Sequence, residues 1–441
     1  MKQYNLSKFP TCVQVLALAM TISGAPALTA AEPQVKSAKP LPITLDALVA
    51  EVLAKNPELD FYRAELAAAA GERRTAATRS NPDLSTTLGD KRTSRPLISD
   101  GLVWSVSITQ TFEWPGRISL RKAIADQRTK LAELGLEQFR AALASRARVL
   151  AFHLFAEQEK AAAAREVADR FRELREVLVQ RDPAGLTPVL ETRIIEATEL
   201  TLQRRATEAA LAERSAQLAL NQLRGQRFDQ SLRIEPPALL FASFPGTDIL
   251  LDSARTNNFE IRMRQAELEQ QGLKVALAVN ERKPAVTVGP YISQERTGDP
   301  ETQFGIGLSV PLPLGNRNAG KVATEEARRL QAETSLLVAQ HNLERQVIET
   351  ALAYETRVNE MARWRPDSVQ QFKAAAALAD RHYRLGAVPI STYVELQKQY
   401  LDAVDALFNT KTDALDAAQE LQQLTGVEPA RLQILKPSVQ R

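Results

Sequence analysis

Four short segments of the chain alternate apolar and polar residues with a period of two, as β-strands with one apolar face do. The alternation is strictest in residues 102–112 and 303–310 and weaker in residues 83–89 and 285–293. In the two strict segments these apolar residues share one face: Trp104, Val106, Ile108, Phe304, Ile306 and Leu308. Serine, threonine and glycine hold most of the opposite positions. The pattern predicts four amphipathic strands, although Pro290 interrupts the third and suits a closed sheet only at a bulge.

Long helical patterns fill most of the remaining chain. No proline occurs between Gly116 and Arg181, and strong helix formers dominate there, so we expect one helix of roughly 100 Å. A second long pattern covers residues 321–385, where Pro366 is expected to kink or break the helix. Shorter helices are predicted over residues 44–55, 57–79, 188–223 and 390–424, and two more, in the same order as the first two, between residues 248 and 282. Helices of this length do not fit a compact soluble domain.

The chain is an internal duplication, because the same succession of elements occurs twice at a nearly constant offset. Matching residues include Arg117 and Arg317, Gly185 and Gly386, Pro188 and Pro389, and Gly225 and Gly426. We assign the first structural repeat to residues 43–225 and the second to residues 248–426. Residues 226–247 link the repeats, and residues 427–441 form a tail that the fold is not expected to need.

The N-terminal residues 1–31 have the features of a secretory signal: Lys2 and Lys8 precede an apolar run over residues 13–22, and small residues follow it. Residues 32–42 are expected to form an extended leader. Cys12, the only cysteine, starts the apolar run, whereas a lipid-bearing cysteine would end it, so we expect no lipidation. No later apolar stretch reaches eighteen residues, so a membrane span would have to consist of strands.

Four amphipathic strands cannot close a barrel, and open strand edges are excluded in lipid. Several copies of the chain would therefore have to pool their strands, with the apolar face toward lipid and the Gly/Ser face toward water. The alternative is a soluble sheet whose apolar face packs on helices.

Two strand-to-helix junctions bear a family resemblance. The sequence QTFEWPGR at residues 110–117 and the sequence PLPLGNRNAG at residues 311–320 stand at matching places in the two repeats. With the repeated strand pair, long helix and returning helix, they resemble the TolC-type outer-membrane efflux proteins, and within them the CzcC-like heavy-metal branch. The resemblance covers residues 43–426.

The resemblance implies a mainly α fold with a small antiparallel β part. It implies a homotrimer in the outer membrane of a Gram-negative bacterium, with a twelve-stranded barrel continued by a periplasmic α-helical barrel. Such proteins are exit ducts that work with a periplasmic adaptor protein and an inner-membrane pump, commonly of the RND class. The adaptor would contact the helical turns at Pro183, Gly185, Gly386 and Pro389.

The resemblance also implies a periplasmic gate. Tyr383 resembles a gate tyrosine, Glu191 stands where the family has a partner aspartate, and Glu395 resembles an acid of the constriction ring. Thr392 and Val388 depart from the family, which places an aspartate and, in some members, an arginine there. The alternative is that the tyrosine serves packing and that the two acids are ordinary solvated residues.

The histidine spacing, the lack of catalytic motifs and the small net charge count against several other functions. His153, His341 and His382 have no metal-ligand spacing on one helix, so neither a metal site nor a cofactor is expected. No catalytic motif occurs, and a net charge of +3 without a basic run gives no case for nucleic-acid binding. We expect an outer-membrane exit duct for heavy-metal cations. The alternatives are a duct for drugs or small organic molecules, a porin or polysaccharide channel, and a periplasmic coiled-coil scaffold; the cargo itself cannot be read from the sequence.

Overall fold

The structure is a computed structural model. It describes residues 42–92, 101–181, 189–237, 239, 241, 243–297, 299–315, 317–365 and 367–427. The expected signal with Cys12, nearly all of the leader, and the C-terminal residues from 428 onward lie outside the described residues. So do residues 182–188, which include Pro183 and Gly185 of the first predicted turn.

Both repeats are built from the same succession of elements. The first contains α1 (Leu45–Lys55), α2 (Glu58–Ala77), β1 (Asp83–Lys91), β2 (Gly101–Phe112), α3 (Arg117–Arg181) and α4 (Val189–Leu223). The second contains α5 (Thr247–Asn257), α6 (Phe259–Asn280), β3 (Val286–Thr297), β4 (Asp299–Ser309), α7 (Ala319–Ala362), α8 (Ser368–Arg384) and α9 (Ile390–Thr425). The predicted unbroken helix of the first repeat is present as α3. Its counterpart ends at Ala362 and resumes at Ser368, which is the break expected near Pro366.

Side chains and glycines set the helix ends as the sequence suggests. The Thr44 hydroxyl accepts a hydrogen bond from the Ala47 N–H at the start of α1. At the end of α8, Gly386 adopts φ 74°, its N–H donates to Tyr383 O, and the Ala387 N–H donates to His382 O. This pair of bonds satisfies carbonyl groups that the last helical turn leaves free. The chain therefore reverses sharply before Pro389 and enters α9.

The four strands form one antiparallel sheet in the order β1-β2-β3-β4. The strands β3 and β4 are longer than the predicted segments 285–293 and 303–310, because the polar residues expected to form a loop continue the ladder as far as the pair Thr297 and Asp299. Pro290 sits in β3 without a bulge, since Ser107 pairs with Tyr291 and Gln110 with Val288 in one unchanged register.

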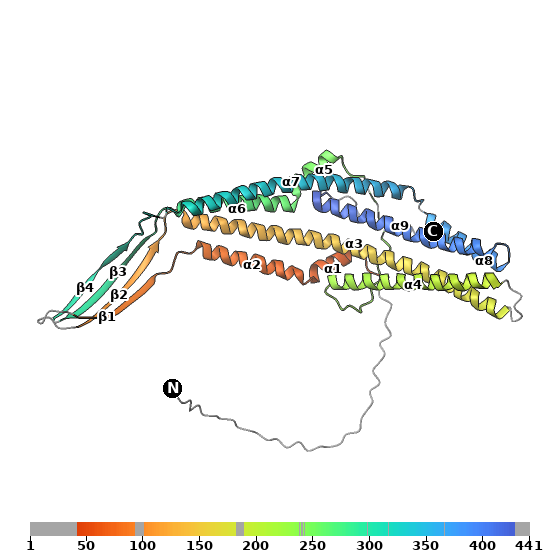
Figure 1. Cartoon of the computed structure of the whole chain (residues 1–441), viewed down its shortest axis with the longest axis horizontal. Helices are drawn as coiled ribbons and strands as arrows, with labels where there is room; N and C mark the ends of the chain where they lie inside the picture. The colour runs from red at the N-terminus through yellow and green to blue at the C-terminus, as the bar shows by residue number, and fades with distance from the viewer. Residues whose placement is uncertain are drawn as a thin grey trace, which may run out of the picture. The chain divides into compact units, whose positions relative to one another are not determined.

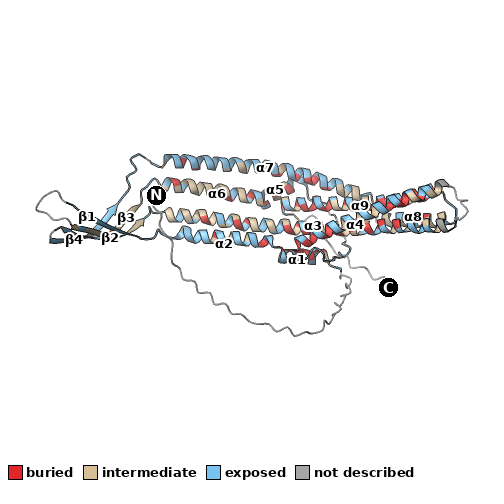
Figure 2. Ribbon diagram, turned by 60° about the horizontal axis from the view of Figure 1, so that its bottom comes forward, coloured by how far each residue is buried: buried red, intermediate tan, exposed pale blue. Residues whose placement is uncertain are grey.

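The helices nearest the sheet lie side by side in the same order as the strands to which they connect. In Figure 1, α2, α3, α6 and α7 run side by side from the strands, and contacts join α2 to α3, α3 to α6, and α6 to α7. The returning helices α4 and α9 pack on α3 and on α7, respectively, and α9 also contacts α3. Buried residues gather where α1, α3, α4, α8 and α9 pack, as Figure 2 shows. None of the helices in the described residues is long and apolar enough to cross a membrane.

Candidate functional site: the amphipathic sheet and the helical turn

The predicted apolar face of the sheet is continuous across all four strands. Residues that pair directly lie on the same face of a sheet, and the register pairs Leu84 with Ile108, Leu88 with Trp104, Ile292 with Phe304, Val288 with Leu308 and Pro290 with Ile306. On the outermost strand, Phe304, Ile306 and Leu308 are 87%, 77% and 70% exposed. Ile108 is also exposed, whereas Trp104 and Val106 are half-buried.

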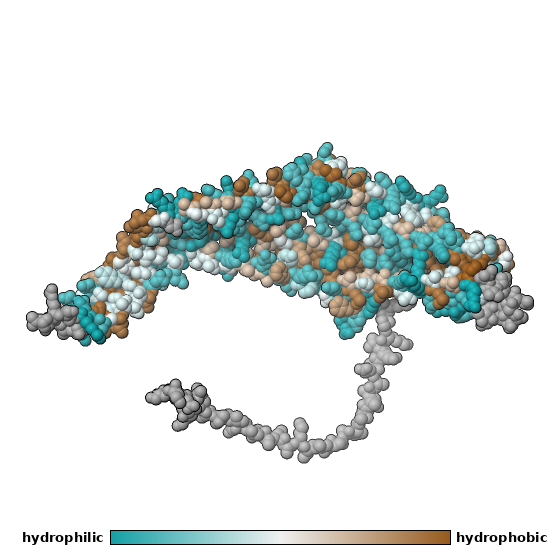
Figure 3. All heavy atoms as spheres, viewed as in Figure 1, coloured by the Kyte–Doolittle hydropathy of each residue, from teal (hydrophilic) through white to brown (hydrophobic). Residues whose placement is uncertain are grey.

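No helix of the described chain packs over this face. The alternative of a soluble sheet covered by its own helices therefore lacks the packing that it requires. Apolar exposure continues into the segment after β4, where Leu312 and Leu314 are exposed. Figure 3 shows brown, hydrophobic residues bordering the strand region and its junction with the helices. An apolar surface of this kind marks contact with another apolar phase or another protein.

The opposite face carries small and polar residues. The Thr111 and Thr287 hydroxyl oxygens lie 3.0 Å apart across β2 and β3. Glycine is required at Gly289, where a Cβ would lie 2.0 Å from the Ile108 carbonyl oxygen. At Gly305 a Cβ would lie 2.9 Å from the Tyr291 ring, which would have to move. The sheet therefore has one apolar side and one hydrated side.

The edges of the sheet are open. Within the described residues β1 pairs only with β2, and β4 pairs only with β3. Each outer strand therefore presents a row of backbone N–H and C=O groups that another strand could pair with.

The QTFEWPGR motif ties the sheet to the helices. Arg121 on α3 binds both oxygens of Glu113, at 2.5 and 2.8 Å. Arg117 donates to the carbonyl oxygen of Lys283 at 2.8 Å, and the Lys283 ammonium lies 4.9 Å from the centre of the Trp114 ring. These contacts fix the β2-to-α3 junction against the chain between α6 and β3.

The turn between α8 and α9 borders a cavity of about 470 Å³. Four predicted residues line it: Glu191, Tyr383, Gly386 and Pro389. Burial raises the pKa of the Tyr383 hydroxyl, and the nearby Glu191 carboxylate raises it further. Among the described residues no hydrogen bond joins Tyr383 to Glu191. Glu395 is not part of this lining; it is exposed and accepts a hydrogen bond from Gln399 at 2.9 Å.

Sequence reasoning missed the aromatic stack behind this cavity. The Tyr383 ring stacks on Tyr393 at 5.3 Å between centroids, and Tyr393 stacks on Phe171 at 4.9 Å. The stack joins α8, α9 and α3, and it buries Tyr393 and Phe171 completely. Burial raises the pKa of the Tyr393 hydroxyl, and the Asp380 carboxylate raises it further. The available signal was the helical spacing of Ile390, Tyr393 and Gln397 on one face of α9.

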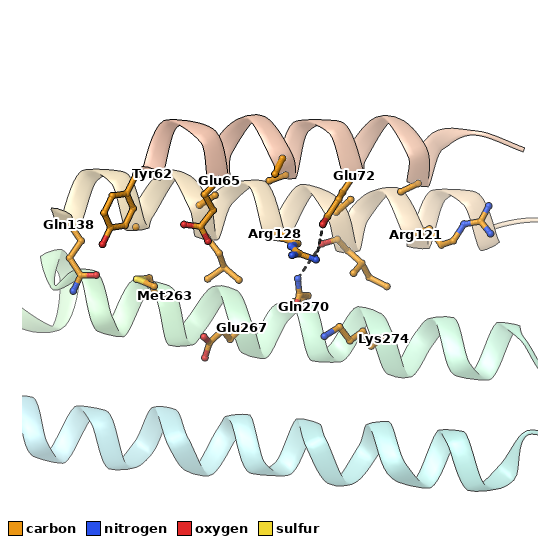
Figure 4. Close-up of a pocket in the computed structure, with 18 of the residues that line it drawn as sticks. Tyr62, Glu65, Glu72, Arg121, Arg128, Gln138, Met263, Glu267, Gln270 and Lys274 are labelled. Atoms are coloured by element: carbon orange, nitrogen blue, oxygen red, sulfur yellow. Dashed lines mark hydrogen bonds and ion pairs between the residues drawn. The ribbon is translucent and has the colours of Figure 1, made fainter. Parts of the chain in front are cut away.

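A second cavity, of about 930 Å³, lies between α2, α3 and α6 (Figure 4). Its charged lining is balanced: acids at Glu65, Glu72 and Glu267, and bases at Arg121, Arg128 and Lys274. Glu72 and Arg128 form an ion pair at 2.8 Å. Across the described residues, no group of three His, Cys, Asp or Glu side chains is placed to hold a metal ion. Neither cavity is therefore built as a metal site.

Comparisons with known proteins agree with this architecture. Residues 250–427 match the family described as Outer membrane efflux protein. The cobalt-zinc-cadmium resistance protein CzcC of Cupriavidus metallidurans is 25% identical over 296 residues, which are 66% of this chain and 68% of that protein.

Solved structures share the fold. The outer-membrane channel OprN superposes with a TM-score of 0.70 at 19% identity, covering 87% of this chain and 89% of OprN. The CusC structure superposes with a TM-score of 0.69 at 13% identity, covering 86% and 91% of the two chains. The repeated architecture, the family match over residues 250–427 and the CzcC similarity agree in making the chain similar to the TolC-type outer-membrane efflux proteins.

Proposed function

We propose that this protein is the outer-membrane exit duct of a tripartite system that exports heavy-metal cations. The observation that carries the proposal is the four-stranded sheet, whose exposed apolar face and open edges continue directly into long helices. The name of the CzcC relative, a cobalt-zinc-cadmium resistance protein, supports a metal cargo. Among the described residues no side-chain group is placed to hold a metal ion, so on this proposal selectivity belongs to the pump and the adaptor.

The internal duplication supports assembly from several copies. Across the seam between the repeats, Lys130 of α3 pairs with Glu269 of α6 at 3.5 Å, and Arg148 of α3 donates to Gln419 of α9 at 3.5 Å. Phe152 of α3 packs with Leu415 of α9 in one buried cluster. The first repeat thus uses one face of α3 to bind the second repeat.

The matching face of α7 has no partner within the described chain. The counterparts of Lys130, Arg148 and Phe152, each 200 residues later, are Leu330, Ile348 and Leu352, which are 63%, 49% and 65% exposed. Exposed leucine and isoleucine at seam positions indicate a surface that another protein covers.

The complementary surface lies on the first repeat. Gln419 of α9 corresponds to Leu218 of α4. Met263 of α6, which lines the cavity between α3 and α6, corresponds to Phe61 of α2. Leu218 and Phe61 are 37% and 68% exposed. A second copy would therefore place its α2 and α4 against α7, and its β1 beside β4. Three copies would close the ring with twelve strands, as the family resemblance implies.

In this assembly the apolar sheet face meets lipid and the Gly/Ser face lines the pore. The α8–α9 turn, with Gly386 and Pro389, lies at the far ends of the long helices from the strands, as do the end of α3 and the start of α4. Pro183 and Gly185, between those two helices, lie outside the described residues. We assign the contact with the periplasmic adaptor to these turns and the gate to Tyr383, Glu191 and Glu395.

The test is transport in cells that lack their own channel of this family and carry a metal-exporting RND pump and its adaptor. Expression of the protein should lower the cell content of Zn²⁺, Co²⁺ or Cd²⁺, measured by elemental analysis, while the Ile306→Arg variant should not. Lower accumulation of an organic dye with unchanged metal content would instead indicate a drug duct. Unchanged accumulation of both would contradict the export function.

A further inference from the structure

Three cations meet at the end of the sheet nearest the helices, where the β2-to-α3 connection lies against the α6-to-β3 connection. The Arg117 guanidinium donates to three uncharged oxygen atoms, which are the backbone and side-chain oxygens of Asn280 and the carbonyl oxygen of Lys283. Arg282 and Lys283 are neighbours in the chain, and both are exposed. None of the three cations forms an ion pair with a described acid.

The acids beside these cations already have other partners. Both carboxylate oxygens of Glu113 accept hydrogen bonds from Arg121. Glu281, next to Arg282 in the chain, pairs with Lys321 of α7. The charges of Arg117, Arg282 and Lys283 therefore remain without a counter-charge from the described chain.

The opposite end of the sheet differs in charge. There Lys91 pairs with Glu295, and Arg92 pairs with Asp90 at 3.1 Å. Within the described residues, the excess of cations is therefore a feature of the helix-side end alone.

Trp114 places the three cations at the border of the apolar face. Phe112, two residues earlier, pairs with Val286 on that face. The Trp114 side chain is partly exposed, and the Lys283 ammonium lies 4.9 Å from the centre of its ring. Its indole N–H donates to no described residue. A tryptophan between an apolar surface and a charged one is typical of the boundary between lipid and water.

We propose that Arg117, Arg282, Lys283 and Trp114 bind the headgroup of an anionic phospholipid, in the membrane leaflet nearer the helices. The inference rests on the proposed function, which places the sheet in a membrane. Lysine and arginine near a membrane surface attract anionic lipids, and their N–H groups donate to phosphate oxygens. The apolar border beside them receives the acyl chains.

The apolar border favours a lipid over a free phosphate ion, although both present the same phosphate chemistry. On the neighbouring β4-to-α7 connection, Leu312 and Leu314 are 72% and 83% exposed. A free phosphate would leave this surface in water, whereas the acyl chains of a bound lipid would cover it.

The test uses the full-length protein in vesicles that contain equal amounts of phosphatidylglycerol, which is anionic, and phosphatidylcholine, which is zwitterionic. After extraction in a mild detergent, mass spectrometry counts the molecules of each lipid that remain on the protein. The unchanged protein should retain phosphatidylglycerol over phosphatidylcholine by about fivefold or more. Arg282→Gln combined with Lys283→Gln should lower that ratio by about fivefold or more, because each cation contributes roughly that factor at a membrane surface.

The matched control is Arg363→Gln combined with Arg365→Gln. These two arginines are also exposed and have no described acid partner, but they lie at the break between α7 and α8, far along α7 from the strands. The control should retain the lipid ratio of the unchanged protein. An equal fall in the ratio for both double variants would overturn the proposal, because it would assign the preference to overall charge.

Two further results would also overturn it. One is a ratio near one for the unchanged protein. The other is loss of the preference when inorganic phosphate replaces chloride at the same ionic strength, because that would identify a site for free phosphate.

Flotation of the vesicles separates this inference from the proposed function. A protein that inserts into the vesicles and retains both lipids equally contradicts the headgroup site alone. A protein that floats with vesicles of neither lipid contradicts the placement of the sheet in a membrane, and with it the site.

Discussion

Asn56 and Asn258 each join three parts of their repeat with one amide group. The Asn56 side-chain oxygen accepts from the Glu58 N–H at 2.9 Å, and that of Asn258 accepts from Glu260 and Ile261 at 2.9 and 3.2 Å. Their amide N–H groups bind the ends of α4 and α9, and both side chains are buried. Each amide therefore bonds the first turn of one helix and the end of another.

Asn56→Ala and Asn258→Ala should each reduce stability by about 1–2 kcal/mol, because each removes a side-chain bond to the start of a helix and leaves a buried carbonyl oxygen without this donor. The control is Asn257→Ala: Asn257 is exposed and makes a longer bond of 3.4 Å to Thr425 O. Thermal unfolding in detergent measures the difference. If Asn257→Ala lowers the stability as much as Asn56→Ala and Asn258→Ala do, the side-chain bonds of Asn56 and Asn258 have no special role in stability.

Ile306 and its neighbour Gly307 test the two faces of the sheet. Ile306→Arg should impair membrane insertion by about 2–4 kcal/mol, because it would place a charge on the lipid face. Gly307→Arg projects from the opposite face and should instead alter ion conductance, with insertion retained. Fractionation of outer membranes and planar-bilayer recording distinguish the two results. If arginine at Ile306 and arginine at Gly307 have the same effect on insertion and conductance, the assignment of Ile306 to the lipid face and Gly307 to the pore face is wrong.

Among the elements, the α8–α9 turn is where a gate can be tested. Tyr383→Phe combined with Glu191→Gln removes a hydroxyl and a charge that face one cavity, and we expect single-channel conductance to rise by roughly twofold or more. The matched control is Glu196→Gln, which changes a partly exposed acid paired with Arg193 on the same helix, α4. If the double variant conducts like the control, the cavity is not the gate.

Glu395 requires its own measurement, because it does not share that cavity. Three copies of an exposed carboxylate near a threefold axis would attract cations, so Glu395→Gln should weaken channel block by a trivalent cation. Unchanged block would exclude Glu395 from the constriction.

The same turn carries the expected adaptor contact. Ala387→Cys should crosslink to the periplasmic adaptor in intact cells, because Ala387 lies in the exposed turn at the opposite ends of the helices from the strands. Asp299→Cys, at the start of β4, is the control at the other end. Crosslinks from Asp299→Cys alone would reverse the orientation of the protein.

Most elements could be predicted from the sequence because their signals are local. Alternation identified the strands, and the proline-free run identified α3. The extension of β3 and β4 could not be predicted, because residues 294–302 are polar without alternation. The ladder there is accompanied by an ion pair between Glu295 and Lys91, which are distant in sequence.

The aromatic stack of Phe171, Tyr393 and Tyr383 escaped prediction for the same reason, since three separate helices bring its rings together. The candidate gate was therefore only partly predicted: the sequence identified Tyr383 and Glu191, and the structure added the packing behind them.

At the scale of the whole molecule, the seam on α7 determines assembly. Ile348→Asp should prevent oligomer formation, because a carboxylate without a partner at the seam costs about 1–3 kcal/mol per contact. Gln346→Asp is the control, since Gln346 and its counterpart Arg146 are both exposed. Light scattering after size-exclusion chromatography gives the mass, and Leu218→Arg should restore the oligomer. If the Ile348→Asp variant forms an oligomer of the same mass as the unchanged protein, this face of α7 is not the contact between copies.

The open edges of the sheet also affect how the protein is made. A newly exported chain presents two unpaired strands beside exposed residues such as Phe304 and Leu308. Such an edge can pair with any strand that it meets, which is how aggregation begins. The lone chain is therefore a hazard in an aqueous compartment, and its safe lifetime depends on how soon other copies or a chaperone reach it. Overproduction should yield aggregates wherever synthesis outpaces that encounter.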